Sequence, residues 1–395
     1  MNNEISEQEN DMETDRRTLL KAGAGVVAAS LFSANNAGAE TPAGVGPYEA
    51  KAYGASSATS PLQEIAIERR ALGANDVLLD ILYCGVCHSD IHTVRGEWGP
   101  AHYPCVPGHE IIGRVWAIGS QVTKFKVGDI GGVGCMVNSC RTCEHCEEDL
   151  EQYCQKGATF TYDTPDASTK AGYTQGGYSD KIVVTEHFVI RIPPGANLAA
   201  TAPLLCAGIT TFSPMQYWKL HEGQRVGIIG LGGLGHVAVK LAVAHKAHVT
   251  VFTTSSNKVA DAKRLGASET VLSSDADAMK QLASQFDLLI STVPETYGMG
   301  PFIELLKLDG TLVNVGAMAP LRDIHGLKLA LGRRSLAGSI IGGIAETQEV
   351  IDFCTARNIT ADVEMIKPSE INAAYDRVVN KDVRYRFVID MEAKG

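Results

Sequence analysis

A glycine-rich turn between an apolar run and a helical segment constrains the fold of this chain more than any other feature. Residues 225–235 read RVGIIGLGGLG, and residues 236–244 have the composition of a helix. A G-x-G-x-x-G pattern is weak evidence alone, but between a buried strand and a helix it indicates a dinucleotide-binding βαβ unit. There Gly230 makes the turn, Gly232 lets the backbone approach the pyrophosphate and Gly235 allows close helix–strand packing, while the helix N-terminus attracts phosphates. The predicted cofactor-binding residues of this turn are Gly230, Leu231, Gly232, Gly233, Leu234 and Gly235.

The segment after the next predicted strand, residues 249–252, indicates which dinucleotide binds. Sites for NAD place an Asp or Glu about twenty residues after the glycines, where it holds the ribose 2′-hydroxyl. Residues 253–258 read TTSSNK and contain no acidic side chain. Hydroxyl groups and a lysine would accept a 2′-phosphate, so the sequence predicts NADP(H). The alternative is that the lysine is only a solvated residue of a first helical turn. The predicted ligands are Thr253, Ser255, Ser256 and Lys258.

The distribution of strands and helices predicts two domains, as the length of 395 residues also does. Strand-like runs at 287–293 and 311–316 continue an alternation of strands and helices from about 207 to 337. That alternation predicts an α/β fold with a doubly wound parallel sheet. The segment from about 47 to 206 is richer in short strands, glycines and turn clusters, as expected for a β-barrel-like domain.

Composition and charge exclude two classes of partner. The formal net charge of −10 argues against nucleic acid, because phosphate binding needs a basic surface. No stretch reaches the ~20 apolar residues that a membrane-spanning helix requires. We therefore expect neither a nucleic-acid partner nor a membrane span.

The N-terminal residues resemble a twin-arginine export signal. Arg16 and Arg17 precede an apolar run at 22–32, and residues 37–39 read AGA, a small-x-small cleavage pattern. The acidic residues before the arginines depart from the usual pattern, and an amphipathic leader or disordered tail is the alternative. We expect residues 1–39 to be a signal peptide that engages the twin-arginine machinery, so that the folded protein reaches the periplasm. Without a functional signal the protein would stay in the cytoplasm.

Four cysteines crowd into a loop-like segment of fifteen residues. Two-residue gaps between thiolates suit the tetrahedral coordination of a structural zinc ion. A pair of disulfides explains this spacing poorly, and nothing else in the chain requires the electron relay of an iron–sulfur cluster. We therefore predict a structural zinc site with no open position. Its ligands are Cys140, Cys143, Cys146 and Cys154.

A second set of metal-binding residue types is dispersed along the chain. Cys84 and Cys87 lie close together, His109 and Glu110 follow, and Cys206 is far downstream. A catalytic zinc ion takes three protein ligands and keeps a fourth position for water or substrate. Each of these residues could instead be an ordinary core residue, and their spacing alone does not assemble a site.

Several motifs together resemble the zinc-containing medium-chain alcohol dehydrogenases, and most closely their cinnamyl-alcohol-dehydrogenase-like branch. Beyond the four-cysteine loop and the glycine turn, the motifs are Gly85-Val86-Cys87-His88-Ser89-Asp90-Ile91-His92, Pro107-Gly108-His109-Glu110, Gly176-Gly177-Tyr178-Ser179, Gly338-Ser339-Ile340-Ile341-Gly342-Gly343 and Arg384-Tyr385-Arg386-Phe387-Val388. The resemblance covers essentially all of the chain after the signal. It implies a GroES-like β-barrel catalytic domain at 47–206 and 338–395, a Rossmann NADP-binding domain at 207–337, and an active site in the cleft between them.

The resemblance also assigns metal ligands. Cys87, His109 and Cys206 match the ligands of the catalytic zinc. Glu110 matches a carboxylate behind the metal that can replace a departing ligand, whereas Cys84 matches no ligand position and is interpreted as a core thiol. The resemblance thus implies two zinc ions per chain, one catalytic and one structural.

Further roles follow from the same motifs. Asp90 would hydrogen-bond a ligating imidazole and so fix its tautomer. Ser89 would hold the substrate oxygen, and His92 would pass a proton toward solvent, because histidine titrates near neutral pH. The positions that border the nicotinamide in relatives are Thr210, Thr292 and Gly316.

These expectations converge on an NADP(H)-dependent reductase of aldehydes that is reversible with primary alcohols, including aromatic or allylic ones. Trp98 is a candidate wall of an apolar substrate pocket, although it could equally be a core or surface tryptophan. The alternatives are a polyol dehydrogenase and a non-catalytic zinc-bound binding protein on the same scaffold. A zinc-free quinone reductase would not carry both cysteine sets. The sequence leaves the oligomeric state open, and a homodimer is compatible with it.

Overall fold

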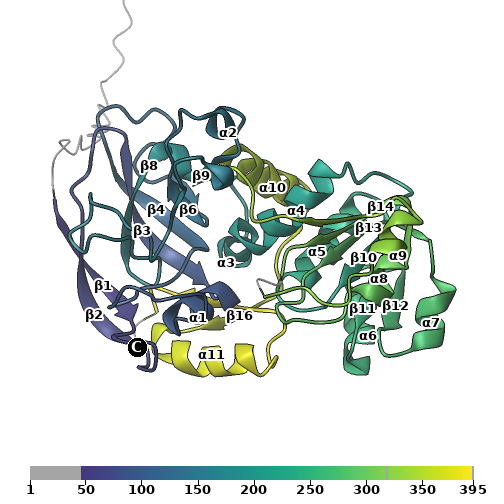
Figure 1. Cartoon of the computed structure of the whole chain (residues 1–395). Helices are drawn as coiled ribbons and strands as arrows, with labels where there is room; N and C mark the ends of the chain where they lie inside the picture. The colour runs from purple at the N-terminus through teal and green to yellow at the C-terminus, as the bar shows by residue number, and fades with distance from the viewer. Residues whose placement is uncertain (1–45, 317–318, 394–395) are drawn as a thin grey trace, which may run out of the picture. The chain divides into compact units, whose positions relative to one another are not determined.

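The computed structural model describes residues 46–316 and 319–393. The predicted signal peptide at 1–39 lies outside the described residues. Two larger sheets organise the described part of the chain (Figure 1).

The first sheet is the predicted doubly wound parallel sheet. Its six strands follow the order β12-β11-β10-β13-β14-β15, and each neighbouring pair is parallel. The order reverses beside β10, which is where such sheets bind ligands at the carboxyl ends of their strands. The strands are β10 (Arg225–Ile229), β11 (His248–Thr253), β12 (Glu269–Leu272), β13 (Phe286–Ser291), β14 (Leu306–Asn314) and β15 (Ser335–Gly338).

The apolar sequence of β10 explains its central position. Its burial pattern places four consecutive residues in the interior, as expected for a strand covered on both faces. The predicted helix after the glycine turn is α5 (Gly235–Ala244). Strand β14 differs from the prediction, because it begins at Leu306 rather than Thr311. Its register against β13 shifts between these two residues, and Asp309 has a left-handed φ of 64°, so the irregular start reads in sequence as a turn.

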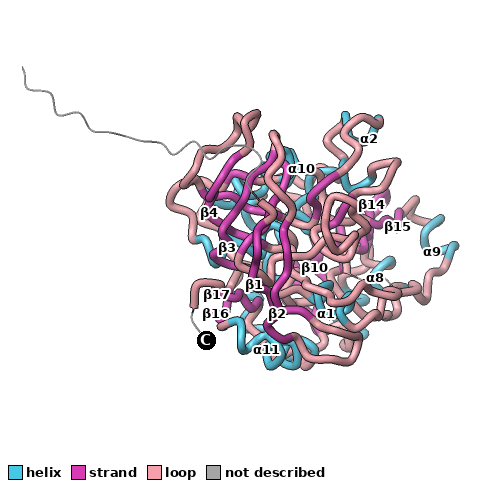
Figure 2. The backbone as a smooth tube through the Cα atoms, turned by 90° about the vertical axis from the view of Figure 1, so that its left-hand side faces the viewer, coloured by secondary structure: helices cyan, strands magenta, loops and turns pink. Residues whose placement is uncertain are grey.

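The second sheet has seven strands and includes the last strand of the chain. Its order is β16-β17-β3-β4-β5-β9, with β8 pairing with β3. Four of these strands, β16, β17, β3 and β4, are labelled on the same side of the molecule in Figure 2. The strands are β3 (Asp76–Gly85), β4 (Ile111–Ile118), β5 (Ile130–Val133), β8 (Lys181–Thr185), β9 (Ile190–Arg191), β16 (Val363–Ile366) and β17 (Arg386–Asp390). Because β17 pairs antiparallel with β3, the C-terminal residues lie beside the first strands of the chain.

Two small antiparallel pairs complete the strands. They are β1 (Tyr48–Gly54) with β2 (Gln63–Arg69), and β6 (Met136–Asn138) with β7 (Thr159–Phe160). The remaining helices connect or cover the sheets. They are α1 (His88–Val94), α2 (Glu144–Glu147), α3 (Leu198–Thr201), α4 (Ala207–Tyr217), α6 (Val259–Arg264), α7 (Ala276–Gln281), α8 (Gly300–Ile303), α9 (Gly326–Ala330), α10 (Ile344–Ala356) and α11 (Ile371–Val379), with 3-10 turns η1 (Glu151–Tyr153), η2 (Glu186–Phe188), η3 (Ala202–Leu205), η4 (Ser256–Lys258) and η5 (Pro368–Glu370).

One continuous apolar core joins the two sheets. It includes side chains from β3 and β4 together with side chains from β10 and α5. Within the described ranges no single helix has the length and apolar composition needed to cross a membrane, and only the bent pair Leu198–Leu205 and Ala207–Tyr217 meets that test jointly.

Candidate active site and metal centres

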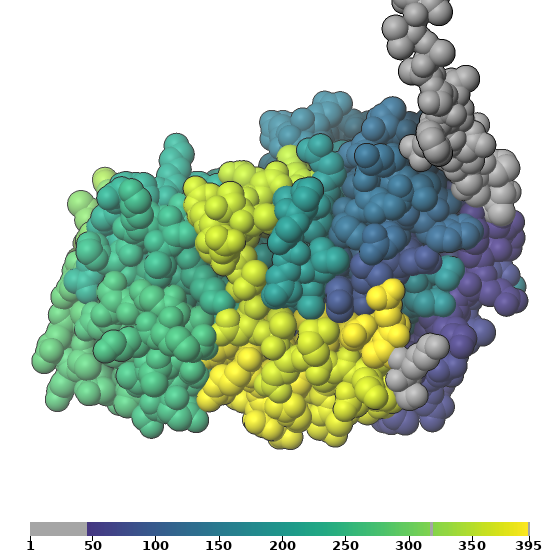
Figure 3. Space-filling model, turned by 180° about the vertical axis from the view of Figure 1, so that it is seen from behind, coloured from purple at the N-terminus to yellow at the C-terminus, as the bar shows by residue number. Residues whose placement is uncertain are grey.

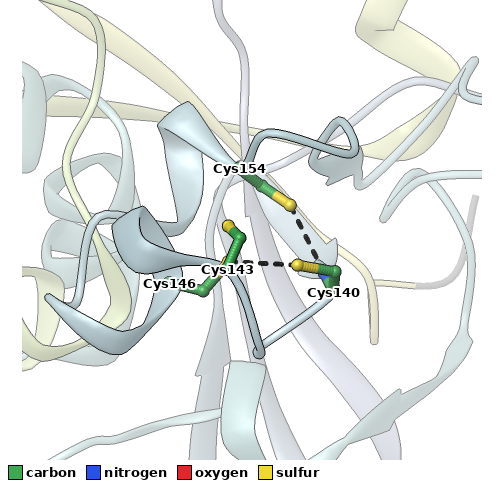
Figure 4. A group of neighbouring side chains, drawn as sticks. All are labelled: Cys140, Cys143, Cys146 and Cys154. Atoms are coloured by element: carbon green, nitrogen blue, oxygen red, sulfur yellow. Dashed lines mark hydrogen bonds between the residues drawn. The ribbon is translucent and has the colours of Figure 1, made fainter.

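The four cysteines of the loop converge on one point (Figure 4). Their sulfur atoms all lie within 4.8 Å of one another, and the sulfurs of Cys140 and Cys146 are 3.9 Å apart. Two thiolates on one tetrahedral zinc ion, each at about 2.3 Å, would be roughly 3.8 Å apart. The ten cysteines form no disulfide, which excludes the disulfide interpretation of this cluster.

Backbone N–H groups of this loop donate hydrogen bonds to the cysteine sulfurs. The N–H of Cys140 donates to the Cys154 sulfur at 3.4 Å, and the N–H of Gln155 donates to the Cys143 sulfur at 3.5 Å. The N–H of Thr142 is the main cause that lowers the pKa of Cys140 to about 6. Hydrogen bonds of this kind favour the thiolate, which is the form that binds a metal ion.

A buried glutamate attaches this loop to the rest of the protein. Glu151 is 1% exposed, accepts a hydrogen bond from His187 Nε2 at 2.7 Å and accepts another from the N–H of Ile344 at 3.0 Å. A Cβ atom at Gly343 would lie 1.7 Å from the Asp149 carbonyl oxygen, so only glycine allows the loop to approach α10 this closely. Sequence reasoning missed Glu151, whose partners are distant in the chain.

The dispersed residues also converge. Each of four buried residues places one ligand atom in a common group, and these four atoms all lie within 4.8 Å of one another. The residues are Cys87, His109, Glu110 and Cys206. The sulfurs of Cys87 and Cys206 are 4.0 Å apart, which fits two ligands of one zinc ion and is far too long for a disulfide. Cys84 is completely buried and lies outside this group.

Three different structural elements bring these residues together. Cys87 is the N-cap of α1, directly after β3. His109 and Glu110 immediately precede β4, which pairs with β3. Cys206 lies between η3 and α4. The fold, rather than local spacing, therefore assembles the group.

Asp90 holds the imidazole of the histidine in this group. One carboxylate oxygen is 3.1 Å from His109 Nδ1, so the Nε2 atom is left to face the thiolates. The carboxylate is fully buried and also accepts from the N–H groups of Cys87 at 2.8 Å and Gly108 at 3.0 Å. The Tyr178 hydroxyl donates to it at 3.2 Å. Tyr178 belongs to the Gly176-Gly177-Tyr178-Ser179 motif, and no local sequence pattern predicts its contact with Asp90.

Glu110 forms a buried ion pair with Arg386 from β17. Burial raises the pKa of Glu110 to about 7, although Arg386 acts in the opposite direction. A Cβ atom at Gly233 would lie 2.9 Å from Arg386 Cδ, so this arginine touches both the metal-ligand group and the glycine turn. Sequence reasoning gave Arg386 no role, and only the three-dimensional contacts reveal one.

The predicted relay residues lie beside the same group. The Cys87 thiol donates to the Ser89 hydroxyl oxygen at 3.6 Å, and His92 Nδ1 is 2.5 Å from a Glu97 carboxylate oxygen. Within the described ranges no hydrogen bond joins Ser89 to His92 directly. Trp98 is 51% exposed and stacks on His92 with a ring separation of 4.9 Å, so it is a surface tryptophan next to the relay.

The glycine turn has the geometry that a dinucleotide requires. Gly230 has a φ of 91°, and a Cβ atom on Gly235 would lie 2.1 Å from the Gly230 carbonyl oxygen. A Cβ atom on Gly232 would meet no protein atom within 4 Å, which leaves that face of the turn open to a ligand. The Thr292 hydroxyl donates to the carbonyl oxygens of Ile229 at 3.0 Å and Gly230 at 3.1 Å, and thereby holds the turn.

The remaining predicted cofactor residues occupy the surrounding elements. Gly316 follows β14 and packs against Thr292, where a Cβ atom would lie 2.5 Å from the backbone carbon. Thr210 is buried in α4, at 6% exposed. The Thr253 hydroxyl accepts from the N–H of Ser255 at 3.2 Å. Ser256 is exposed at the start of η4.

Lys258 reaches across the glycine turn instead of extending into solvent. Its Nζ atom donates to the Leu231 carbonyl oxygen at 2.8 Å. Burial is the main cause that lowers the pKa of Lys258, with further contributions from Arg384 and Lys381. The interpretation as a merely solvated residue is therefore not supported.

Comparison with known proteins identifies the family to which this arrangement belongs. The profile of the alcohol dehydrogenase GroES-like domain matches residues 73–194, and that of the zinc-binding dehydrogenases matches residues 233–356. The aldehyde reductase YahK of Escherichia coli is 53% identical over 342 residues, which cover 86% of this chain and 97% of that protein. The chain belongs to the zinc-binding alcohol dehydrogenase family.

Two further members of the family are similar over nearly their whole length. A mannitol dehydrogenase from Petroselinum crispum is 51% identical over 84% of this chain and 98% of that protein. The structure of a cinnamyl alcohol dehydrogenase from Helicobacter pylori complexed with NADP(H) has a TM-score of 0.83 and 41% identity, covering 88% of this chain and all of that one. The predicted resemblance and the predicted fold class, a GroES-like domain with a Rossmann domain, are confirmed.

Proposed function

We propose that this zinc-binding alcohol dehydrogenase transfers hydride between NADP(H) and aldehydes or primary alcohols, including aromatic or allylic ones. The convergence of Cys87, His109 and Cys206 beside the glycine turn carries the proposal. Arg386 supports it, because this one side chain contacts both regions. The names of the relatives, an aldehyde reductase and a cinnamyl alcohol dehydrogenase, point to the same substrate class.

The donor sets of both clusters fit zinc. Cys87, His109 and Cys206 would hold the catalytic ion and the four loop cysteines the structural one. When bound, the catalytic ion supplies a Lewis acid for the substrate oxygen and NADP(H) supplies or accepts the hydride. Asp90 fixes the His109 tautomer with Nδ1 protonated, so that Nε2 presents a lone pair to the metal.

The chain's own residues would handle the proton. The Ser89 hydroxyl lies next to the Cys87 sulfur, where it can hydrogen-bond the substrate oxygen. His92, on the next turn of α1, can accept that proton and is oriented by Glu97 through Nδ1. Proton transfer from Ser89 to His92 would require a connection that the two side chains do not form directly in the described part of the chain.

The preference for NADP(H) rests on the residues after β11. Ser255, Ser256 and Lys258 replace the acidic residue of an NAD site. The ammonium group of Lys258 is held beside the glycine turn by the Leu231 carbonyl oxygen. The Helicobacter pylori neighbour was solved with NADP(H).

The test is an assay of the purified chain with NADPH and NADH across aliphatic, aromatic and allylic aldehydes, with Ser89→Ala as a matched variant. We expect NADPH-dependent reduction that falls about a hundredfold or more in the variant. Bound zinc without hydride transfer to any substrate would favour the non-catalytic binding protein instead.

A polyol dehydrogenase is the second candidate, and the mannitol dehydrogenase from Petroselinum crispum favours it. The same assay in the oxidative direction separates the two. A higher kcat/KM for mannitol and related polyols than for primary aromatic alcohols would select the polyol dehydrogenase. The opposite ranking would select the aldehyde reductase.

We propose that the chain is exported through the twin-arginine pathway. The paired Arg16 and Arg17 and the apolar run at 22–32 support this proposal, and export of a folded protein would protect thiolate zinc sites from oxidation during assembly. Fractionation of cells should find shortened protein in the periplasm. Replacement of both arginines by lysine should retain the full-length chain in the cytoplasm, and unchanged localisation of that variant would contradict the proposal.

We further propose a homodimer formed at the edge of the parallel sheet. Strand β15 pairs only with β14 in that sheet and contains no charged residue. Leu327 and Leu331 nearby are 70% and 78% exposed, an apolar surface that a second copy could cover. Light scattering should give twice the chain mass, and Leu327→Glu with Leu331→Glu should give monomers. A monomeric wild-type protein would contradict the proposal.

A further inference from the structure

Two cations are held next to each other at the edge of the predicted nucleotide site. Lys258, at the end of η4, donates to the Leu231 carbonyl oxygen at 2.8 Å, and Arg384 donates to Asp261, three residues after Lys258, at 2.8 Å. Arg384 comes from the segment between α11 and β17, and so does Lys381, whose charge also acts on Lys258. Figure 3 shows the late part of the chain, in yellow, in contact with the green part that contains the glycine turn and the following segments. Residues of the chain's last segment therefore reach the cofactor half of the protein.

The carboxylate of Asp261 attracts the charge on Lys258, but it is already hydrogen-bonded to Arg384. The Lys258 Nζ atom donates to a neutral carbonyl oxygen, that of Leu231, and forms no ion pair with any carboxylate of the described residues. Burial lowers the pKa of Lys258, Arg384 and Lys381 lower it further, and Asp261 acts in the opposite direction. A partly buried ammonium group that shares one carboxylate with a neighbouring guanidinium group is stabilised when a further anion binds.

Arg384 is placed to bind such an anion. Its Nε atom donates to Asp261 at 2.8 Å, which fixes one edge of the guanidinium group. The terminal nitrogens, Nη1 and Nη2, donate to no group in the described part of the chain, and the side chain is 42% exposed. A guanidinium group with two adjacent free N–H donors matches the geometry of phosphate oxygens. Lys381 already pairs with Glu295 at 2.9 Å.

We propose that Arg384 is a specificity-determining residue that binds the 2′-phosphate of NADP(H) together with Lys258. The proposal rests on the proposed function, which places the dinucleotide at the glycine turn. It adds a ligand from outside the strand–turn–helix unit, so that the phosphorylated cofactor is held by both halves of the described protein. NAD(H) has no phosphate for Arg384 and gains nothing from it.

Equilibrium titration of the full chain with NADPH and NADH, followed by fluorescence, tests this proposal without requiring turnover. We expect Arg384→Ala to weaken NADPH binding about tenfold, the effect of losing one charge-assisted contact, and to leave NADH binding within about twofold. Arg384→Lys should be intermediate, because it keeps the charge but loses the planar fork. Lys258→Ala should weaken NADPH binding by at least as much as Arg384→Ala.

Arg333→Ala is the matched control. Arg333 lies just before β15, carries the same charge and pairs with Asp309, and it contacts neither Asp261 nor Lys258 among the described residues. An equal loss of NADPH affinity in this control would attribute the effect to net charge and overturn the proposal.

The remaining outcomes separate this proposal from the proposed function. A wild-type preference for NADPH that Arg384→Ala leaves unchanged overturns the role of Arg384 alone. An equal loss of NADPH and NADH affinity in that variant also overturns it, because the contact would not involve the 2′-phosphate. Wild-type protein that binds NADH as tightly as NADPH overturns the cofactor preference and the role of Arg384 together.

Discussion

The two cysteine-rich centres of this protein are built in opposite ways. The four-cysteine loop collects its ligands from fifteen residues, between Cys140 and Cys154. The other centre draws Cys87, His109 and Cys206 from separate elements, and its outer contacts extend to β17. The first centre lies within its own loop, whereas the second exists only after β3, β4 and the start of α4 have come together. We therefore expect the loss of a ligand from the four-cysteine loop to lower mainly the stability of the protein, and the loss of a ligand from the dispersed centre to lower mainly its activity.

The groups around each centre differ as well. Backbone N–H groups of Cys140 and Gln155 surround the loop thiolates. Buried carboxylates, Asp90 and Glu110, adjoin the dispersed centre and are held by Tyr178 and Arg386. The loop also has a side-chain contact, because the Cys146 thiol donates to Ser139 Oγ at 3.4 Å. Backbone donors cannot be exchanged by mutation, but side-chain groups can tune a metal ion. The dispersed centre, with two buried carboxylates and their partners, therefore offers more positions at which a single substitution should alter its properties.

The largest expected effect is on activity. Cys206→Ala should reduce aldehyde reduction at least about a thousandfold, because the loss of a ligand removes the several kcal/mol of charge stabilisation that the metal supplies. Zinc analysis should show one ion per chain instead of two, with a melting temperature close to that of the wild type. Loss of both zinc ions in this variant would contradict the expectation that the loop centre keeps its ion without the dispersed centre.

The matching change in the loop should act on stability. Cys143→Ala removes a ligand of the structural centre and should lower the free energy of unfolding by several kcal/mol, because metal binding there is coupled to folding of the loop. Thermal melting measures the loss, and activity at low temperature should persist at a reduced level. A variant with unchanged melting temperature but no activity would reverse the roles assigned to the two centres.

A smaller change should tune the dispersed centre alone. Tyr178→Phe removes a hydrogen bond of 3.2 Å to Asp90 and so loosens the orientation of His109. We expect zinc to leave this centre about tenfold faster when a chelator is added, while the loop zinc leaves at the wild-type rate. Tyr53→Phe is a suitable control, since its hydroxyl bonds the distant Glu64 at 3.5 Å. Equal acceleration in the control would refute the role of Tyr178.

The smallest effect concerns the attachment of the loop and depends on pH. Burial tends to raise the pKa of Glu151, but the hydrogen bonds from His187 and the Ile344 N–H lower it overall. A lowered pKa stabilises the folded protein above the ordinary value of about 4.3, and this stabilisation disappears as the pH falls through the folded pKa. Glu151→Gln should therefore cost about 1–2 kcal/mol at pH 7, and its difference from the wild type should shrink below about pH 4.

Urea unfolding of the wild type and of Glu151→Gln across this pH range measures the difference between their free energies of unfolding. Titration of the thiolates affects both proteins equally and therefore cancels in this difference. Glu148→Gln, which changes an exposed residue of the same loop, provides the control and should match the wild type. If the difference in free energy of unfolding between the wild type and Glu151→Gln stayed constant down to pH 4 and below, the charge of Glu151 would not contribute to stability.

Local patterns allowed much of this structure to be predicted from sequence. Strand β10 has the bounds expected from its apolar run, and α5 begins one residue before the expected start. Both depend on neighbouring residues only. The start of β14 was wrong, because a register shift against β13 and the turn-like Asp309 conceal a strand that tertiary pairing creates.

Long-range contacts marked the limit of prediction. Arg386 and Glu110 are 276 residues apart, and Tyr178 and Asp90 are 88 apart. No periodicity or spacing relates such pairs, since the folding of β17 onto β3 brings the first pair together. The ligands themselves were named because their motifs resemble a family, while the residues that orient them became visible only in three dimensions.

The order of the ligands along the chain has a consequence for biosynthesis. All four loop cysteines leave the ribosome before Cys206 does, and the strand that carries Arg386 is among the last segments to emerge. A nascent chain can thus capture one metal ion on the loop while the other centre is still incomplete. We therefore expect the loop ion to bind first and the second ion to bind only after Cys206 has joined Cys87 and His109, so that the protein acquires its two ions in succession.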